Sequence, residues 1–188
     1  MLRLPLSWFL VLASTLLLSA CCGSVSCECG DGYDNALFFR FNLDSTSTRG
    51  FSSADLDTVY LKRYAIPVAG SAASRPDSVR IIRPRSAAAQ PVIINVGQPF
   101  LTGNRLDAYT YDLYLGKSFQ LSQARARYRI EAVKLQGELV GNGCCTCYRN
   151  RRKTLTLTST INGQATTLPY DLTDPAGEDQ PVYVTLSR

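Results

Sequence analysis

Histidine is absent from this chain of 188 residues, and its only methionine and only tryptophan are Met1 and Trp8. Without histidine the chain has no Ser-His-Asp or Cys-His catalytic group, no histidine-ligated metal or haem, and no histidine pH switch. The composition, 45% hydrophobic and 19% charged, is ordinary for a globular protein and excludes full disorder or a collagen-like repeat. The length suits one domain. Evidence on function must therefore come from the cysteines, the arginines and the strand patterns.

The first twenty residues have the features of an export signal. Residues 1–20 carry one positive charge, Arg3, and no acidic residue, and the run from Leu4 to Leu18 is almost wholly apolar. This run has the length of a signal-peptide core and is short for a membrane span. We therefore predict that residues 1–20 are a cleaved signal peptide, whose removal leaves the mature chain without Met or Trp.

The signal ends in Leu18-Ser19-Ala20-Cys21, which resembles the lipobox of bacterial lipoprotein precursors: a branched apolar residue, two small residues and a cysteine. The resemblance implies that the Cys21 thiol receives a diacylglyceryl group, that cleavage precedes Cys21, and that the new amino terminus is acylated. A plain secretory signal shares the small residues, so the cysteine is the distinguishing feature. Two or three acyl chains anchor a protein stably. We expect a lipid-anchored protein of the bacterial cell envelope, at the outer membrane, on either its periplasmic or its surface side.

The mature chain is predicted to be an arm followed by one β domain. Residues 21–35 are rich in Gly, Ser, Cys and Asp and have no periodicity, which indicates an N-terminal arm or tether. Residues 36–188 contain short alternating segments separated by Gly and Pro turns, which favours an all-β domain. We expect an antiparallel β-sandwich of about eight strands, immunoglobulin-like or transthyretin-like. The predicted strands are 36–43, 58–64, 79–83, 92–96, 108–115, 126–140, 154–161, 166–171 and 182–186.

Two local patterns predict backbone geometry. In the longest predicted strand the apolar residues change from even positions, as at Ile130, to odd positions, as at Val133 and Leu139. That switch predicts a β-bulge near Ala132, because one extra residue reverses which side chains face the core. Asn162-Gly163 supplies the residues that a two-residue type I′ hairpin requires.

The cysteines form two clusters more than a hundred residues apart. Once Cys21 is assigned to lipid, six remain: Cys22, Cys27, Cys29, Cys144, Cys145 and Cys147. An even number in an exported protein favours disulfides, and short spacing within each cluster disfavours internal bonds. We predict that the arm is bridged to the loop holding the second cluster, while the choice among the fifteen possible pairings stays open.

A thiolate site is the alternative interpretation of the same residues. The Cys27-Glu28-Cys29 and Cys144-Cys145-Thr146-Cys147 spacings resemble those of metallothionein-like clusters, and four thiolates suit Zn²⁺ or Cu(I). A thiol-redox function is a third possibility. The chain has no histidine, so disulfides remain the preferred interpretation, and we expect no cofactor.

Positive charge is concentrated in the middle of the chain, where residues 75–153 hold 14 basic and 5 acidic residues. Arg125, Arg127 and Arg129 recur at period two, which places them on one face of a strand. A second basic group follows the cysteines: Arg149, Arg151, Arg152 and Lys153. Together they are candidates for binding anionic lipid headgroups, phosphates or acidic polysaccharide. The alternative, which we favour, is a solvated strand face whose arginine stems cover apolar surface.

Other candidates are weaker. Tyr109, Tyr111 and Tyr114 suggest a stacking platform for sugars, although core packing explains them better. Acidic residues that could bind Ca²⁺, but without EF-hand spacing, are Asp55, Asp57, Asp171, Asp174, Glu178 and Asp179. No catalytic constellation or nucleic-acid motif is visible. We therefore expect a non-enzymatic binding or assembly module whose partner is an envelope protein or an anionic glycan or lipid, and not a nucleic acid.

Overall fold

The computed structural model describes Cys27, Cys29 and residues 33–44, 46–67, 69–70, 75–101, 105–174 and 180–188. The predicted signal peptide, the predicted lipidation site Cys21 and the bridge candidate Cys22 lie outside these residues. Within them, no helix is long and apolar enough to cross a membrane.

The described residues form a mostly β structure, as the alternating segments predict. Short 3₁₀ turns accompany the strands, and one of them, Leu121–Gln123, is the single helical turn in the stretch between the fifth and sixth strands. The strands are β1 (Ala36–Phe41), β2 (Thr58–Ala65), β3 (Asp77–Ile82), β4 (Val92–Asn95), β5 (Tyr109–Leu115), β6 (Ala126–Asn142), β7 (Cys145–Ile161), β8 (Gln164–Asp171) and β9 (Tyr183–Leu186).

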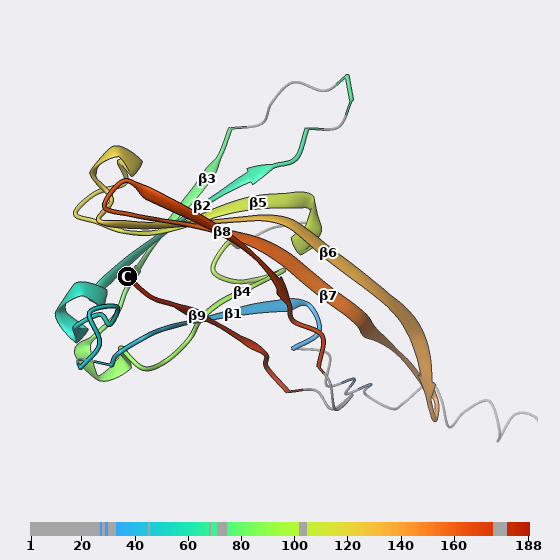
Figure 1. The fold of residues 1–188 in the computed structure, drawn as a ribbon. Helices are drawn as coiled ribbons and strands as arrows, with labels where there is room; N and C mark the ends of the chain where they lie inside the picture. Colours follow the sequence, from blue (N-terminus) through green and yellow to red (C-terminus); the bar gives the residue numbers. More distant parts are fainter. Residues whose placement is uncertain are drawn as a thin grey trace, which may run out of the picture.

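The strands are arranged in two sheets (Figure 1). The larger has six strands in the order β3-β2-β5-β6-β7-β8, and every neighbouring pair is antiparallel. The smaller has the order β4-β1-β9, in which β1 pairs antiparallel with β4 and parallel with β9. The parallel pairing, which the sequence did not predict, brings the first and last described strands together.

The two sheets share one apolar core. Leu37 and Phe39 of β1 are fully buried, as are Leu61 of β2, Leu113 of β5 and Val184 of β9. Burying one such side chain stabilises a fold by about 1.5–3 kcal/mol. Because core residues recur at every second position, alternation along each strand directs one side-chain row into the space between the sheets.

The predicted bulge in β6 is confirmed. Ala132 has a positive φ of 50°, and the β6–β7 register shifts between Glu131 and Lys134. Ile130 on one side of the shift and Val133 on the other both belong to the core, so the extra residue does reverse the inward parity. Leu139 is an exception: it continues the odd pattern but is 70% exposed. It lies beyond a second register shift, on the part of the hairpin that extends past the core (Figure 1).

The predicted β7–β8 turn is also confirmed. Asn162 and Gly163 have φ angles of 51° and 83°, and Ile161 pairs with Gln164. Positive φ at both central residues defines the type I′ geometry that the Asn-Gly sequence favours. The hairpin sets β8 on the far edge of the larger sheet.

Candidate functional site

The second cysteine cluster lies at the tip of the β6–β7 hairpin. The sequence suggested a loop here, but Cys145 and Cys147 belong to β7, which begins nine residues before the predicted start at Thr154. Only Gly143 and Cys144 form the turn, with Gly143 at a φ of 59°. The loop expectation was wrong because turn-forming composition extends over several residues, whereas ladder pairing with β6 continues to Asn142.

Two disulfides join the N-terminal arm to this tip, as the cluster-to-cluster prediction required. Cys27 bonds Cys145 with an S–S distance of 2.04 Å and a Cα–Cα distance of 5.6 Å. Cys29 bonds Cys147 with corresponding distances of 2.10 and 5.2 Å. Cys144 is disulfide-bonded as well. We call the Cys27–Cys145 and Cys29–Cys147 bridges the clasp.

The clasp follows from strand periodicity. Side chains two residues apart in an extended strand point to the same side, so Cys145 and Cys147 present two sulfurs in a row. Cys27 and Cys29 have the same spacing, and both bridges span 118 residues. The arm therefore runs alongside β7 in the same direction, and a Cys-x-Cys pair on each segment is what makes two adjacent bridges possible.

A buried lysine fastens the arm a second time. Lys153 Nζ of β7 donates hydrogen bonds to the carbonyl oxygens of Tyr33, at 2.7 Å, and Ala36, at 3.1 Å. Burial lowers the pKa of Lys153. Asn150 adds a backbone N–H donated to Asp34 Oδ1 at 3.2 Å and a side-chain amide donated to the Asp34 carbonyl. The structure thus places Lys153, a candidate anion ligand, in the interior as a clamp on the arm.

Arg127 and Arg129 share one face of β6, as their spacing predicts, and both contact Asp112 of the neighbouring strand β5. Arg127 makes a bidentate pair with this fully buried carboxylate, at 3.0 Å for each contact. Arg129 Nη1 lies 3.6 Å from Asp112 Oδ2, and its Nε lies 2.7 Å from Glu131. These two arginines therefore compensate buried and neighbouring carboxylates on the outer face of the larger sheet.

The other basic candidates lie elsewhere. Arg125 is near Asp55, with a 3.5 Å contact, whereas Arg151 pairs with Glu138 on the hairpin and Arg152 is exposed beside it. Arg152 opposes Gln136, ten residues along β6 from Ala126, which corresponds to roughly 33 Å of strand. The structure does not bring the basic candidates into one patch.

The three tyrosines do not form a shared platform. Tyr111 is buried in the core, where its hydroxyl donates to the Leu106 carbonyl at 3.1 Å. Tyr114 is on the opposite face of β5, where it stacks on Tyr60 with ring centroids 5.4 Å apart. Burial raises the pKa of Tyr114 to about 12. Tyr109 is half-buried. Packing accounts for all three positions.

A charged cleft of about 460 Å³ is lined by Leu115 at the end of β5, Ala126 at the start of β6 and Ile161 at the end of β7. These strand ends are the ones far from the clasp, which joins the β6–β7 tip. Asp55 in its wall accepts the Ser52 hydroxyl at 2.6 Å and the Arg188 guanidinium at 2.7 Å. The Ser52 hydrogen bond is the main cause that lowers the pKa of Asp55, with smaller contributions from Arg188 and Arg125. Asp57 and Lys117 also line this cleft.

The acidic candidates do not assemble. Asp171 instead accepts hydrogen bonds from Thr173 in a local turn, and Glu178 and Asp179 lie outside the described residues. Among the residues that the structure describes, no group of three Cys, Asp or Glu side chains is arranged to hold a metal ion.

An exposed edge is the feature that sequence reasoning missed. Strand β3 ends the larger sheet, and Ile82 at its end is 70% exposed. A groove of about 690 Å³ separates this end of β3 from β4 of the smaller sheet, where Ile93 is 39% exposed. The alternating pattern identified both strands, but an edge strand and an internal strand look alike in sequence.

Comparison of the chain with protein families, with curated protein sequences and with solved structures finds no match. The argument on function therefore depends on the chain's own residues and geometry.

Proposed function

We propose that this protein is a lipid-anchored component of the bacterial cell envelope, at the outer membrane, and acts as a non-enzymatic binding or assembly module. The observation that carries the proposal is the clasp, in which Cys27 and Cys29 are bonded to Cys145 and Cys147. Disulfides of this structural kind persist in oxidising compartments outside the cytoplasm. They agree with an exported chain whose Cys21 is assigned to lipid by the lipobox resemblance.

The clasp would also orient the domain on its membrane. Cys27 is six residues after Cys21, and a chain of six residues spans at most about 20 Å. The hairpin tip would therefore stay close to the anchoring thiol. The charged cleft, lined by Ala126 and Ile161 at the opposite ends of β6 and β7, would lie away from the lipid. Residues 21–35 act as a short fastened arm, and residues 36–188 are the exposed domain.

A binding role is consistent with the contacts of the buried charged side chains, which are made to other groups of the protein. Two of the buried charged side chains, Asp112 and Lys153, are engaged in an arginine pair and in carbonyl contacts, respectively. We propose further that the two sheets constitute an antiparallel β-sandwich of the immunoglobulin-like or transthyretin-like kind. The shared core between a six-stranded and a three-stranded sheet supports this assignment.

Intact-mass measurement of the protein from its native membrane tests the anchor. We expect a chain that starts at Cys21 and carries the added mass of a diacylglyceryl group and an acyl chain. Cys21→Ser should leave an unlipidated precursor, whereas Cys22→Ser, one residue away, should be lipidated as usual. An unmodified Cys21 in the wild type would contradict the proposal.

Thiol alkylation of the same preparation separates this function from the thiolate alternative. Bound Zn²⁺ or Cu(I), or a redox cycle, requires the clasp sulfurs in reduced form. We expect Cys27, Cys29, Cys145 and Cys147 to react only after reduction. Reaction without reduction, or stoichiometric metal released on acidification, would favour the thiolate function instead.

A further inference from the structure

We infer that the outward edge of β3 binds an extended, acidic segment of a partner protein as an added strand. The inference rests on the proposed binding role, for which it names a partner class, and it does not depend on the lipid anchor. Three independent features of the edge support it: the direction of its backbone groups, its apolar surroundings and its charge.

The direction of the backbone groups in β3 follows from one hydrogen bond. The Arg83 N–H donates to the Asp57 carbonyl at 2.7 Å, which continues the β2–β3 register. In an antiparallel pair, residues alternate between those that bond the partner strand and those that point away. The residues two and four positions before Arg83 therefore also bond β2. The N–H and C=O groups of Ser78, Arg80 and Ile82 point outward, where no described strand pairs with them.

The opposite edge of the same sheet is different. The Leu172 N–H donates to the Lys153 carbonyl at 2.7 Å, so the same alternation turns the backbone groups of Asp171, Pro169 and Thr167 outward on β8. Pro169 has no N–H and interrupts that edge at its middle, which is a common protection against strand addition. The three outward positions of β3 carry no proline, so all three donors are retained.

Apolar side chains line the place that an added strand would occupy. Ile82 and Ile93 are the exposed large apolar residues on the two sides of the groove between β3 and β4. Pro91 and Pro99 contribute to the same groove. Alternate side chains of an added strand would enter this groove while its backbone pairs with β3, which is the arrangement of β-strand addition.

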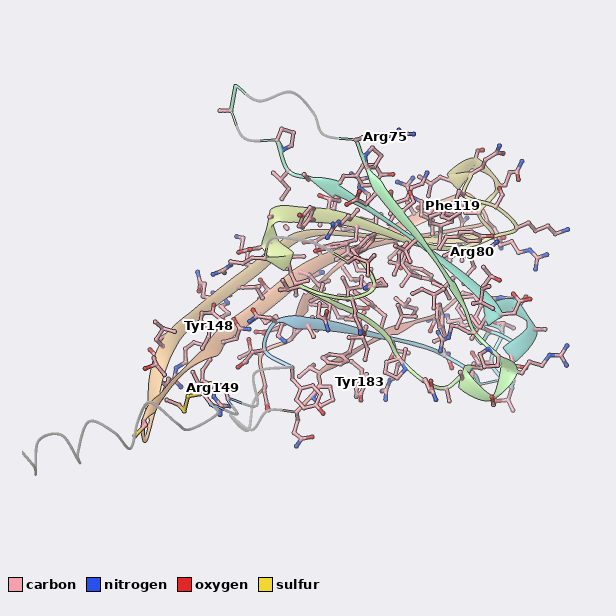
Figure 2. The ribbon with its side chains drawn as sticks, turned by 180° about the vertical axis from the view of Figure 1, so that it is seen from behind. Arg75, Arg80, Phe119, Tyr148, Arg149 and Tyr183 are labelled. Carbon is pink, nitrogen blue, oxygen red and sulfur yellow. A yellow bond between two sulfur atoms is a disulfide. The ribbon has the colours of Figure 1, made fainter. Side chains whose placement is uncertain are left out.

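Charge selects the partner. Arg75 and Arg80 are exposed on and beside β3 (Figure 2), and Arg85 is exposed just after it. None of the three pairs with a described carboxylate. The acidic residue of the strand, Asp77, is already bound by Arg63 at 2.8 Å. In the register centred on Arg80, a second copy of this chain would place arginines opposite arginines, which is unfavourable across a strand pair. A segment that alternates apolar and acidic residues complements both the groove and the charge.

The test uses the full-length protein in detergent and a fluorescein-labelled peptide of about ten residues in which Val and Glu alternate. Fluorescence anisotropy should show saturable binding that weakens with added salt. Ser78→Pro removes one outward N–H and leaves the β2–β3 hydrogen bonds in place, so it should weaken binding about ten-fold. Ser78→Ala retains the N–H and should bind as the wild type does. Arg80→Glu should reduce binding, and Arg80→Lys should retain it.

The opposite results are equally specific. The inference is overturned by absent binding, by Ser78→Pro binding as well as Ser78→Ala, or by equal affinity for a peptide that alternates Val and Lys. A concentration-dependent dimer that Ser78→Pro abolishes would assign the edge to a second copy instead. Circular dichroism confirms that each variant is folded. If the native protein carries lipid on Cys21 but does not bind the peptide, only this inference is overturned. If the native protein binds the peptide but carries no lipid on Cys21, only the proposed anchor is overturned.

Discussion

The two halves of strand β7 are held in the molecule by different forces. From Leu155 onward the strand lies between β6 and β8 and places Leu155 and Leu157 in the core. From Cys145 to Lys153 the strand pairs with β6 alone among the described strands, and its buried residues are Cys147 and Lys153. The comparison shows that a hairpin can extend past the hydrophobic core when covalent bonds and a buried cation replace apolar burial.

Removing the clasp should have the largest effect on this comparison. Because Cys144 is disulfide-bonded as well, the variant must also remove this cysteine. Replacing Cys27, Cys29, Cys144, Cys145 and Cys147 with Ala restores the entropy of a loop of over a hundred residues to the unfolded chain, which should lower the free energy of unfolding by about 4 kcal/mol. Denaturant unfolding measures the loss. Hydrogen exchange should also quicken first in the half of β7 before Lys153, and uniform quickening along β7 would argue against two separate modes of attachment.

Truncation in the other half should destabilise the whole domain. Leu157 is 3% exposed, and Leu157→Ala should lower the free energy of unfolding by about 3 kcal/mol through lost burial and a cavity. Leu139→Ala, on the exposed part of the hairpin, is the matched control and should change stability by less than about 0.5 kcal/mol. Thermal unfolding of both variants checks the contrast, which fails if the two losses are similar.

Lys153 stands at the border between the halves. Lys153→Met leaves the Tyr33 and Ala36 carbonyls without their donor, which should cost about 1–2 kcal/mol near neutral pH. Because burial lowers the folded-state pKa, the native protein loses this proton before the unfolded chain does. The unfolding free energy of the wild type should therefore rise relative to Lys153→Met as the pH rises toward the ordinary lysine value of 10.5.

Urea unfolding at a series of alkaline pH values measures that difference. The exposed Lys134 of β6 provides the control, since Lys134→Met should not produce the same rise. A wild-type advantage that falls as the pH increases would contradict the assigned direction.

The smallest effect is expected at the β7–β8 turn. Gly163 has a φ of 83°, and a methyl group added at its Cα would meet open space, so Gly163→Ala should cost about 1 kcal/mol from backbone strain alone. Asn162→Gly keeps the turn geometry accessible and should change stability by only a few tenths of a kcal/mol. Chemical denaturation compares the two, and an equal loss would mean that the turn contributes through side-chain contacts instead.

Much of the fold could be predicted from local patterns. Short segments in which apolar and polar residues alternate predicted the strands. The change of the apolar residues from even to odd positions predicted the bulge at Ala132, and Asn162-Gly163 predicted a hairpin. The errors occurred where tertiary pairing overrides composition. The Gly- and Cys-containing segment before Thr154 is strand because β6 lies beside it, and the parallel β1–β9 pair depends on a contact between the two ends of the domain.

The arginine face illustrates the limit for sites. The spacing of two residues along the strand placed Arg127 and Arg129 on one face of β6. Nothing in the sequence indicates that Asp112, on another strand, neutralises them. Nor does it show that Lys153 turns inward while Arg152 beside it stays exposed. Local periodicity assigns a side chain to a face, and only the neighbouring strand decides what that face meets.

Residues close together in the chain are sufficient to indicate the export signal pattern, the β class and the division of the cysteines into two clusters. The choice of cysteine partners, the compensation of charges and the strand left at an edge became visible only in the folded molecule. These properties depend on strand order and register, which join residues such as Cys27 and Cys145 across more than a hundred positions. Short-range sequence patterns do not determine which residues pair at that distance. The packing of the strands around the shared core determines it.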